Sequence, residues 1–328
     1  MYIGRELYDR IDDPALQREV FRKSINRVEI ETHSYCNRRC DYCPNVTGDR
    51  LGPNVPMAEA VWRRIVSDLA EVSYSGAMVL TSYNEPLYDR ELILRRLAEA
   101  HRALPAARLM IFTNGDYLVP GYVEALAEAG LAYLHVSIHL KRGDSYSDAY
   151  VRARIEEIAE RSALEVRYTA ARPGELLAAR FVTDRLHMET RAINFDIHGN
   201  DRGGLLPHLS PDGVRTAPCT FVFQHLHVGY TGNVVPCCHI RSDRPEHAAH
   251  VIGNVAEAGS IFPIFGSAKA AAWRRGMINS RPKSGPCAHC TAPMIPGDAN
   301  ALAQFARADR DYAQPAEERL RQGSEARP

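Results

Sequence analysis

Short apolar runs alternate with amphipathic stretches along the chain up to residue 206. The runs are four to six residues long and predict strands at Val28–Glu31, Ala77–Thr81, Arg108–Thr113, Tyr133–Ile138, Leu164–Thr169 and Ile193–Ile197. Between them, apolar residues recur at helical spacing and predict helices at Ala58–Val72, Asp89–Ala103, Val119–Ala129 and Tyr150–Arg161. Strands that alternate with helices in this way indicate an α/β fold in which helices wrap a parallel sheet.

The pattern divides the chain into four parts. Residues 1–26 form a predicted N-terminal helical extension, and residues 27–206 carry the repeat of strands and helices. Residues 207–300 hold five of the eight cysteines, which predicts a small second domain. Residues 301–328 are rich in Arg, Glu and Gln and are expected to form a terminal helix or a disordered tail.

Composition narrows the classes of partner. The 328 residues include 40 Lys plus Arg and 40 Asp plus Glu, so charge gives no reason to expect binding to nucleic acid or to an anionic membrane. No run approaches the roughly 20 apolar residues that a membrane span needs. No signal peptide is recognisable, so we expect a cytoplasmic protein, in which disulfides are disfavoured.

The first group of cysteines has an informative spacing. Cys36, Cys40 and Cys43 follow the strand Val28–Glu31 in the pattern C-x3-C-x2-C. Three thiolates on one tight loop can hold three irons of a [4Fe–4S] cluster and leave the fourth iron open to a small molecule. A structural zinc site is the alternative, but it usually has a second pair of ligands close by, and none follows here.

The second group contains four spaced cysteines and one additional cysteine. The four are Cys219, Cys237, Cys287 and Cys290, and the segment before Cys237 predicts a hairpin with a Gly-Asn turn. Four thiolates suit a complete [4Fe–4S] cluster, and a four-cysteine zinc site would use the same ligand types. Cys238 remains, and because neighbouring strand residues point to opposite faces, it is not expected to share a cluster with Cys237.

These cysteines resemble those of the radical S-adenosylmethionine (SAM) superfamily. In that family the open iron is chelated by the amino and carboxylate groups of SAM, and Tyr42 fits the aromatic residue usual before the third cysteine. The resemblance implies a partial (β/α)6 TIM-like barrel, cleavage of SAM to a 5′-deoxyadenosyl radical, and a low-potential electron donor such as flavodoxin. The second group resembles the twitch domain, a shortened SPASM domain with one auxiliary cluster. Two [4Fe–4S] clusters and SAM are therefore the expected cofactors.

The resemblance also assigns residues to SAM. Ser82-Tyr83-Asn84-Glu85-Pro86 occupies the place of the family's Gly-Gly-Glu-Pro, so Glu85 is the expected partner of the SAM amino group, although Tyr83-Asn84 departs from the Gly-Gly pattern. Glu85 could instead only cap the next helix. The other residues expected to bind SAM are Thr113, Asn114, Gly115, Ser137 and Arg152, with Arg154 as an alternative to Arg152.

Polar residues near the ends of the fourth and sixth predicted strands are candidates for binding substrate. They are His139, Asp196, His198, Asn200, Asp201 and Arg202. The alternatives are a structural histidine and a solvated loop that leads into the second domain. Cys238 is a candidate hydrogen donor to a substrate radical, as in an epimerase.

The favoured hypothesis is a radical SAM oxidoreductase or epimerase that acts on a sugar-, aminocyclitol- or nucleoside-like metabolite of natural-product, including antibiotic, biosynthesis. It rests on the polar strand ends, on residues 1–26 being too short for a peptide-recognition domain, and on the family's aminocyclitol dehydrogenases. A maturase for a peptide or protein is the first alternative, although the seven-cysteine SPASM pattern typical of many maturases is absent. A non-catalytic metal-binding scaffold is the remote one.

Overall fold

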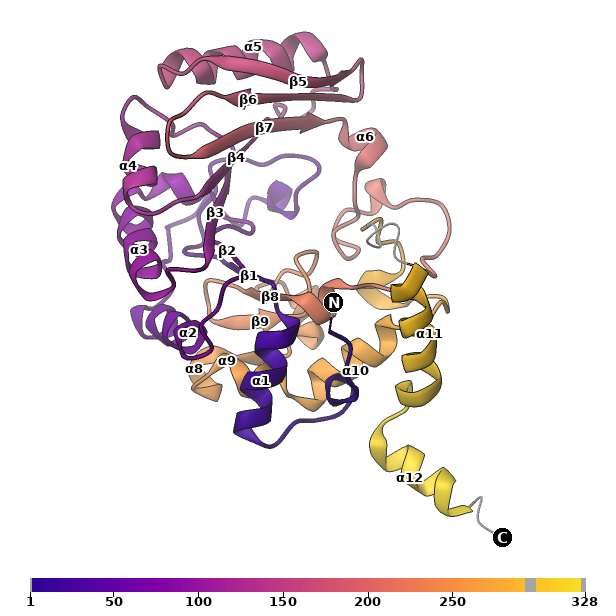
Figure 1. Ribbon diagram of the computed structural model, residues 1–328. Coiled ribbons are helices and arrows are strands. Elements are labelled where there is room, and N and C mark those ends of the chain that lie inside the picture. The colour runs from indigo at the N-terminus through magenta and orange to yellow at the C-terminus, as the bar shows by residue number, and fades with distance from the viewer. Residues whose placement is uncertain (1, 293–298, 326–328) are drawn as a thin grey trace.

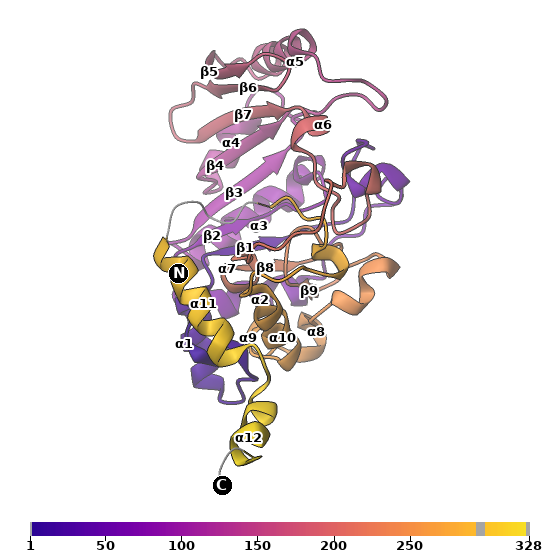
Figure 2. The same cartoon turned by 90° about the vertical axis from the view of Figure 1, so that its right-hand side faces the viewer.

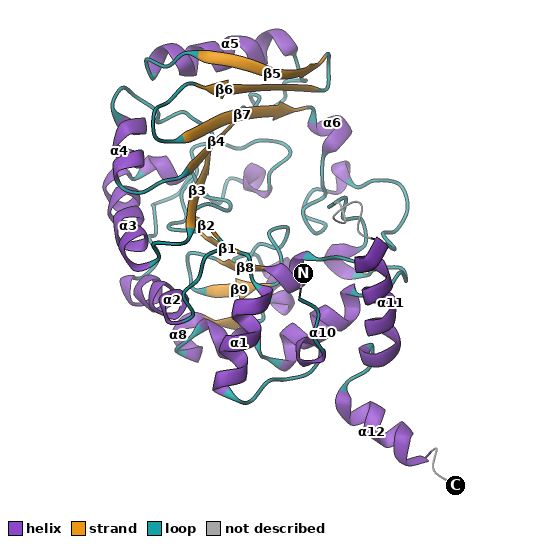
Figure 3. Cartoon of the chain, in the orientation of Figure 1, coloured by secondary structure: helices purple, strands orange, loops and turns teal. Residues whose placement is uncertain are grey.

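The computed structural model describes residues 2–292 and 299–325. Within them, ten strands form one sheet in the order β10-β9-β8-β1-β2-β3-β4-β7-β6-β5 (Figure 3). The strands are β1 (Arg27–Ile30), β2 (Ala77–Val79), β3 (Arg108–Thr113), β4 (Tyr133–Ser137), β5 (Val166–Arg172), β6 (Leu176–Phe181), β7 (His187–Ile193), β8 (His225–Val228), β9 (Asn233–Val235) and β10 (Gly253–Asn254). The central strands from β8 to β7 are parallel, and antiparallel strands extend both edges.

Helices α2, α3 and α4 cover the outer side of this curved sheet (Figure 1), and the other helices of the described residues lie around it. The helices are α1 (Pro14–Ser24), α2 (Glu59–Glu71), α3 (Arg90–Ala103), α4 (Tyr122–Glu128), α5 (Asp148–Arg161), α6 (Phe195–His198), α7 (Phe221–Gln224), α8 (Val255–Ala258), α9 (Ile261–Phe265), α10 (Ala268–Met277), α11 (Ala299–Tyr312) and α12 (Ala316–Glu325). On α2, Trp62, Ile65 and Leu69 share one fully buried stripe, as an amphipathic helix against a sheet requires. Side-chain caps fix helix starts, for example Asp89, which accepts a hydrogen bond from the Leu92 N–H.

The α/β class and the parallel sheet are confirmed, and so are the predicted helices, within a few residues at their ends. The sixth predicted strand, Ile193–Ile197, is wrong: β7 ends at Ile193, and residues 195–198 form α6. Gly174, at φ +70°, allows a tight turn that pairs β5 with β6, and β6 leads into β7 by a second antiparallel pairing. The repeat of strand and helix therefore stops after β5.

The cysteine-rich part continues the same sheet. β8 pairs in parallel with β1 and forms the predicted hairpin with β9, so the expected boundary at residue 206 lies within one continuous sheet and stays a prediction. The N-terminal helix packs here too, because the Phe21 ring meets the Phe262 and Phe265 rings of α9 edge to face at 5.3 Å.

Two helices, α11 and α12, lie at the end of the described residues. Phe305 of α11 is 1% exposed and packs against Phe223. α12 extends away from the sheet (Figure 2). Among the described residues, none of the helices combines the length and apolar character that crossing a membrane requires.

Candidate functional site

The first cysteine loop opens into a central cavity. The cavity has a volume of about 620 Å³ and is lined by Cys36, Cys40 and Cys43, together with residues from the carboxyl ends of β2, β3 and β4. Two backbone hydrogen bonds shape the loop, from the Cys43 N–H to the Cys40 carbonyl (3.0 Å) and from the Cys36 N–H to the Arg50 carbonyl (3.1 Å). All three cysteines of the loop line the same cavity.

The thiols of this loop are buried, and burial raises the pKa of each of them. Burial raises the pKa of the Cys36 thiol to about 12, with further contributions from Glu85 and the other two cysteines. Burial and the neighbouring Cys43 raise the pKa of Cys40 to about 12 as well. Thiols in such surroundings stay protonated unless a bound metal displaces the protons. A donor set of three cysteine thiols on one cavity suits an iron–sulfur cluster held by three cysteines.

Glu85 connects two of the predicted SAM segments. Its carboxylate is 2% exposed and accepts hydrogen bonds from the Thr113 hydroxyl (2.6 Å) and the Asn114 N–H (2.7 Å). It also accepts from the Leu87 N–H (3.1 Å), so the predicted capping role is present alongside any role toward SAM. Burial raises the pKa of Glu85 to about 7 despite these hydrogen bonds.

The segment after β3 is joined to the cysteine loop. The Asn114 amide donates to Asn37 Oδ1 (2.7 Å), and the Arg38 guanidinium binds both oxygens of Asp116 (2.6 and 2.7 Å). Gly115 has φ +75°, and a Cβ there would lie 2.9 Å from the Val136 side chain. Only glycine suits this turn, and the turn places Asn114 at the cavity wall.

Ser137, His139 and Tyr42 also line the cavity. The Tyr42 hydroxyl accepts from the Leu140 N–H (2.9 Å) and lies 3.2 Å from His139 Nδ1. Burial, reinforced by the Arg38 charge, lowers the pKa of His139 to about 3, so the imidazole is neutral at physiological pH. The Tyr42 ring also stacks on Phe195, with ring centroids 3.8 Å apart, and both residues line the cavity.

The other four predicted ligands meet in a second, enclosed pocket. Cys219, Cys237, Cys287 and Cys290 line it together with apolar side chains such as Ile240 and Met277. Burial and the charges of Cys290 and Cys219 raise the pKa of the Cys287 thiol to about 12, which again fits ligands that are deprotonated by a metal.

N–H groups point at two of these sulfurs. Cys237 Sγ accepts from the His239 N–H (3.2 Å), and Cys290 Sγ accepts from the Ala292 N–H (3.4 Å). Such hydrogen bonds to sulfur are one means of setting the reduction potential of a cluster.

Cys238 lies between the two sites. It lines the central cavity, whereas Cys237 lines the second pocket. The Cys238 sulfur lies within 4.8 Å of ligand atoms of Glu29 and His227, and also within 4.8 Å of the Cys237 sulfur.

Five predicted site residues do not line the central cavity. Asp196, His198, Asn200 and Asp201 do not line the central cavity, because the chain leaves the sheet at Ile193 and turns outward through α6. His198 pairs with Glu175 (2.7 Å), and Asn200 donates to Cys290 Sγ (3.7 Å) beside the second pocket. Arg152 is exposed on α5, with its guanidinium 4.2 Å from the Tyr168 ring centroid, and does not reach the cavity.

Of the predicted substrate residues after β7, Arg202 alone lines the cavity. It adopts φ +51°, which is unusual for a residue other than glycine and is typical of functional positions. Its guanidinium has no hydrogen-bond or ion-pair partner within the described part of the chain. The predicted alternative to Arg152, Arg154, instead pairs with Asp116 in a neighbouring cleft.

Sequence reasoning missed the polar floor of the cavity. It is formed by alternate side chains of β1, β4 and β7, namely Arg27, Glu29, Tyr133, His135, Glu189 and Arg191. Glu29 is the parallel partner of His227 on β8, and its carboxylate lies 3.0 Å from His227 Nδ1. The missed signal was polar residues at every second position of strands whose interior face is usually apolar.

Comparisons with known proteins agree with this geometry. A family model described as "Radical SAM superfamily" matches residues 30–166, and one described as "Iron-sulfur cluster-binding domain" (SPASM) matches residues 219–291. The chain is 24% identical over 269 residues to the S-adenosyl-L-methionine-dependent 2-deoxy-scyllo-inosamine dehydrogenase of Niallia circulans, covering 82% of this chain and 93% of that protein. It is 27% identical to a GTP 3′,8-cyclase of Pelotomaculum thermopropionicum, over 40% of this chain and 39% of that one.

A solved structure has the same fold. It is the crystal structure of BtrN in complex with AdoMet and 2-DOIA, with a TM-score of 0.59, 21% sequence identity, and coverage of 84% of this chain and 96% of that one. The two family models match the two parts of the chain that hold the two cysteine groups. The chain therefore carries a radical SAM domain and a SPASM-type iron–sulfur domain, and is an enzyme that uses SAM and two [4Fe–4S] clusters.

Proposed function

We propose that this enzyme dehydrogenates a polar, cyclitol- or sugar-like small molecule at a carbon that bears a hydroxyl or amino group. The dehydrogenase from Niallia circulans, which matches over nearly its whole length, supports the reaction type. The observation that carries the substrate class is the polar floor of a cavity of about 620 Å³, a size ordinary for small ligands.

Seven cysteines are proposed as cluster ligands. Cys36, Cys40 and Cys43 hold the first cluster, with SAM beside Glu85, Asn114 and Ser137; Cys219, Cys237, Cys287 and Cys290 hold the second. When bound, SAM and the clusters supply a 5′-deoxyadenosyl radical and a one-electron acceptor, and we propose a flavodoxin-type protein as the external donor.

The floor of the cavity would bind and deprotonate the substrate. Glu29 is ionised, since the His227 imidazole more than offsets the effect of burial and lowers the pKa of the carboxyl. The Glu29 carboxylate can therefore accept the proton that a substrate hydroxyl loses on oxidation. Arg191 and Arg202 face the same cavity without an ion-pair partner among the described residues, and would hold substrate oxygens.

Cys238 supports a second candidate, epimerisation. Its thiol lines the cavity and could return a hydrogen atom to the substrate. In D₂O an epimerase acquires one deuterium from an exchangeable thiol, and Cys238→Ala loses the product while SAM cleavage continues. A dehydrogenase gives a product without solvent deuterium, and Cys238→Ala retains it.

The direct test uses 2-deoxy-scyllo-inosamine as the first probe, with anaerobically reconstituted enzyme, SAM and dithionite. Mass spectrometry should show 5′-deoxyadenosine together with a product that has lost two hydrogens. The proposal would be contradicted if the enzyme dehydrogenated no member of a panel of aminocyclitols and sugars but turned over a peptide efficiently.

A further inference from the structure

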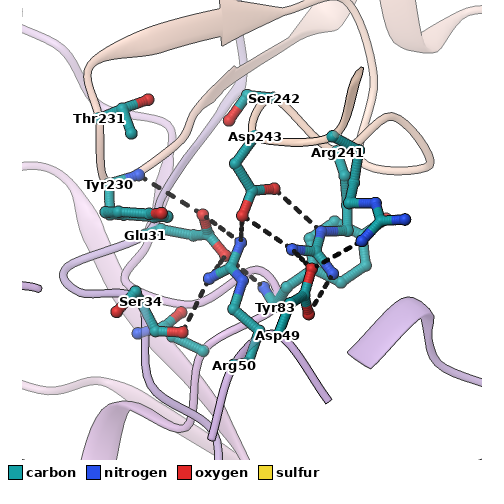
Figure 4. A network of polar contacts seen from close by, with 12 residues as sticks. Glu31, Ser34, Asp49, Arg50, Tyr83, Tyr230, Thr231, Arg241, Ser242 and Asp243 are labelled. Carbon is teal, nitrogen blue, oxygen red and sulfur yellow. Dashed lines mark hydrogen bonds and ion pairs between the residues drawn. The ribbon is translucent and has the colours of Figure 1, made fainter. Parts of the chain in front are cut away.

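A buried network of ion pairs (Figure 4) joins two segments of the chain. The first cysteine segment comprises residues 36–50, and the second cysteine segment comprises residues 237–243. Its central cations are Arg50 and Arg241, whose side chains are 2% and 0% exposed. Its anions are Glu31 at the end of β1, Asp49 after the first cysteine loop, and Asp243 after the second. A buried charge is tolerated only when it is well paired, so the positions of these side chains are tightly defined.

Arg241 reaches from the second segment to the first. It follows Cys238 by three residues, and its guanidinium binds both oxygens of Asp49 (3.2 and 2.9 Å), six residues after Cys43. It also donates to Asn45 Oδ1 at 3.3 Å, two residues after Cys43.

Arg50 makes the reciprocal connection. Its carbonyl accepts from the Cys36 N–H (3.1 Å), and its guanidinium lies 2.9 Å from Asp243 Oδ2 in the second segment. The same guanidinium lies 3.1 Å from Glu31 Oε1. Each arginine thus belongs to one cysteine segment and pairs with a carboxylate of the other.

Tyr83 brings the SAM segment into the network. Its N–H donates to Glu31 (3.0 Å), its carbonyl accepts from Asn45 (2.8 Å), and its hydroxyl donates to the Cys238 carbonyl (2.7 Å). Tyr83 stands two residues before Glu85, at a position where the family pattern has glycine. A glycine has no side chain, so the contact with Cys238 depends on this departure from the pattern.

We propose that Tyr83 and Arg241 are positioning residues that couple the second cluster site to the SAM site. The second cluster anchors Cys237 and, through it, the Cys238 carbonyl and Arg241. These groups hold Tyr83 and Asn45, and so fix the segment that carries Glu85. Loss of the second cluster then weakens SAM binding at the first. The proposal rests on the assignment of the cysteines to two clusters and not on the substrate.

Tyr83→Phe is the cleanest test, because it removes one hydroxyl and keeps the ring. SAM affinity is measured by equilibrium dialysis on reconstituted enzyme, in the wild-type background and in a Cys287→Ala/Cys290→Ala background without the second cluster. We expect Tyr83→Phe to weaken SAM binding about fivefold in the first background, the effect of one ordinary hydrogen bond, and less than about twofold in the second. The electron paramagnetic resonance titration of the first cluster with SAM should shift in parallel.

Tyr74→Phe is the matched control. Tyr74 is also buried, and its hydroxyl also donates to a backbone carbonyl, that of Ala77 at 2.9 Å, but it lies outside the cavity. Its loss should leave SAM affinity unchanged in both backgrounds.

Arg241→Lys tests the network by a second route, since lysine keeps the charge and loses the two-pronged contact with Asp49. Arg274→Lys is its control, because Arg274 is buried among backbone carbonyls away from the network. Unchanged SAM affinity in both Tyr83→Phe and Arg241→Lys would overturn the proposal. An equal loss with and without the second cluster would also overturn it, since Tyr83 would then act on the SAM segment locally. Failure of the wild type to bind two clusters would refute the cysteine assignments instead.

Discussion

The most informative prediction concerns the pH dependence of SAM binding through Glu85. Burial holds the pKa of this carboxyl at about 7, well above the ordinary 4.5. The shift corresponds to about 3 kcal/mol, at ~1.4 kcal/mol per pKa unit, by which burial disfavours the ionised form. An amino group of SAM placed against Glu85 would favour the carboxylate and lower its pKa.

The sign of the effect follows from linkage. Because binding lowers the pKa of Glu85, SAM binds better to the deprotonated form, so affinity rises with pH and a proton is released on binding. With a pKa of about 7 in the free enzyme, about nine tenths of Glu85 is ionised at pH 8 and one tenth at pH 6. The Glu85 contribution should therefore weaken SAM binding about tenfold between pH 8 and pH 6.

Calorimetric titration in buffers of different ionisation enthalpy measures both the affinity and the protons released. The amino group of SAM titrates in a similar range, so the Glu85 contribution is the difference between wild type and Glu85→Gln. Glu165→Gln serves as the control, because Glu165 is an exposed partner of Arg167 on the surface. If Glu85→Gln keeps the wild-type pH profile, Glu85 does not meet the SAM amino group and the reasoning fails.

Two further predictions concern stability. Phe305→Ala should lower the free energy of unfolding by about 3 kcal/mol, because it leaves a cavity against Phe223. SAM cleavage by the folded enzyme should persist. If urea denaturation shows no loss of stability, α11 is not docked in solution. His227→Gln should lower the free energy of unfolding by about 2 kcal/mol, because it removes one of the two cationic partners of the buried Glu29 carboxylate and leaves only Arg27, at 2.5 Å. The pKa of His227 is raised because Glu29 outweighs the effect of burial, and the pKa of Glu29 is lowered. The loss of stability should thus be greatest near pH 5 to 6, between the two ordinary pKa values. It should fall as the pH rises through the raised imidazole pKa, and also as the pH drops through the lowered carboxyl pKa. A loss that does not change with pH would contradict the ion pair.

Much of the fold could be predicted because local patterns determine it. The helical periodicity around Trp62 and the apolar run around Ile111 need no tertiary information to be recognised. The turn at Gly174 was missed, although Pro173-Gly174 is a strong turn signal, because the expected repeat favoured another helix there. The error displaced the sixth strand and with it the predicted substrate residues after Ile193.

In the candidate site, too, the sequence alone predicts some features and only the folded chain shows the others. Cysteine spacing alone predicted two groups of three and four ligands, since thiols in such patterns have few other uses in a protein of this kind. In the structure the two groups line two separate pockets. The pairing of Glu29 with His227 joins residues on β1 and β8 that are far apart in the sequence. No local sequence pattern predicts a contact between strands that become neighbours only when the sheet forms. The alternating polar residues of the strands can be read in the sequence, but the pairing of these charges is visible only in the folded chain.

The central claim is that one cysteine group supports SAM cleavage while the other holds an auxiliary cluster. The measurement that tests it most directly is iron and sulfide content, with electron paramagnetic resonance, on anaerobically reconstituted wild type and on a Cys36/Cys40/Cys43→Ala variant. Two [4Fe–4S] clusters require about eight irons per chain, falling to about four in the variant, with 5′-deoxyadenosine formed from SAM and dithionite only by the wild type. About four irons in the wild type together with bound zinc would contradict the account, because the second site would then be structural and the proposed dehydrogenation would lose its electron acceptor.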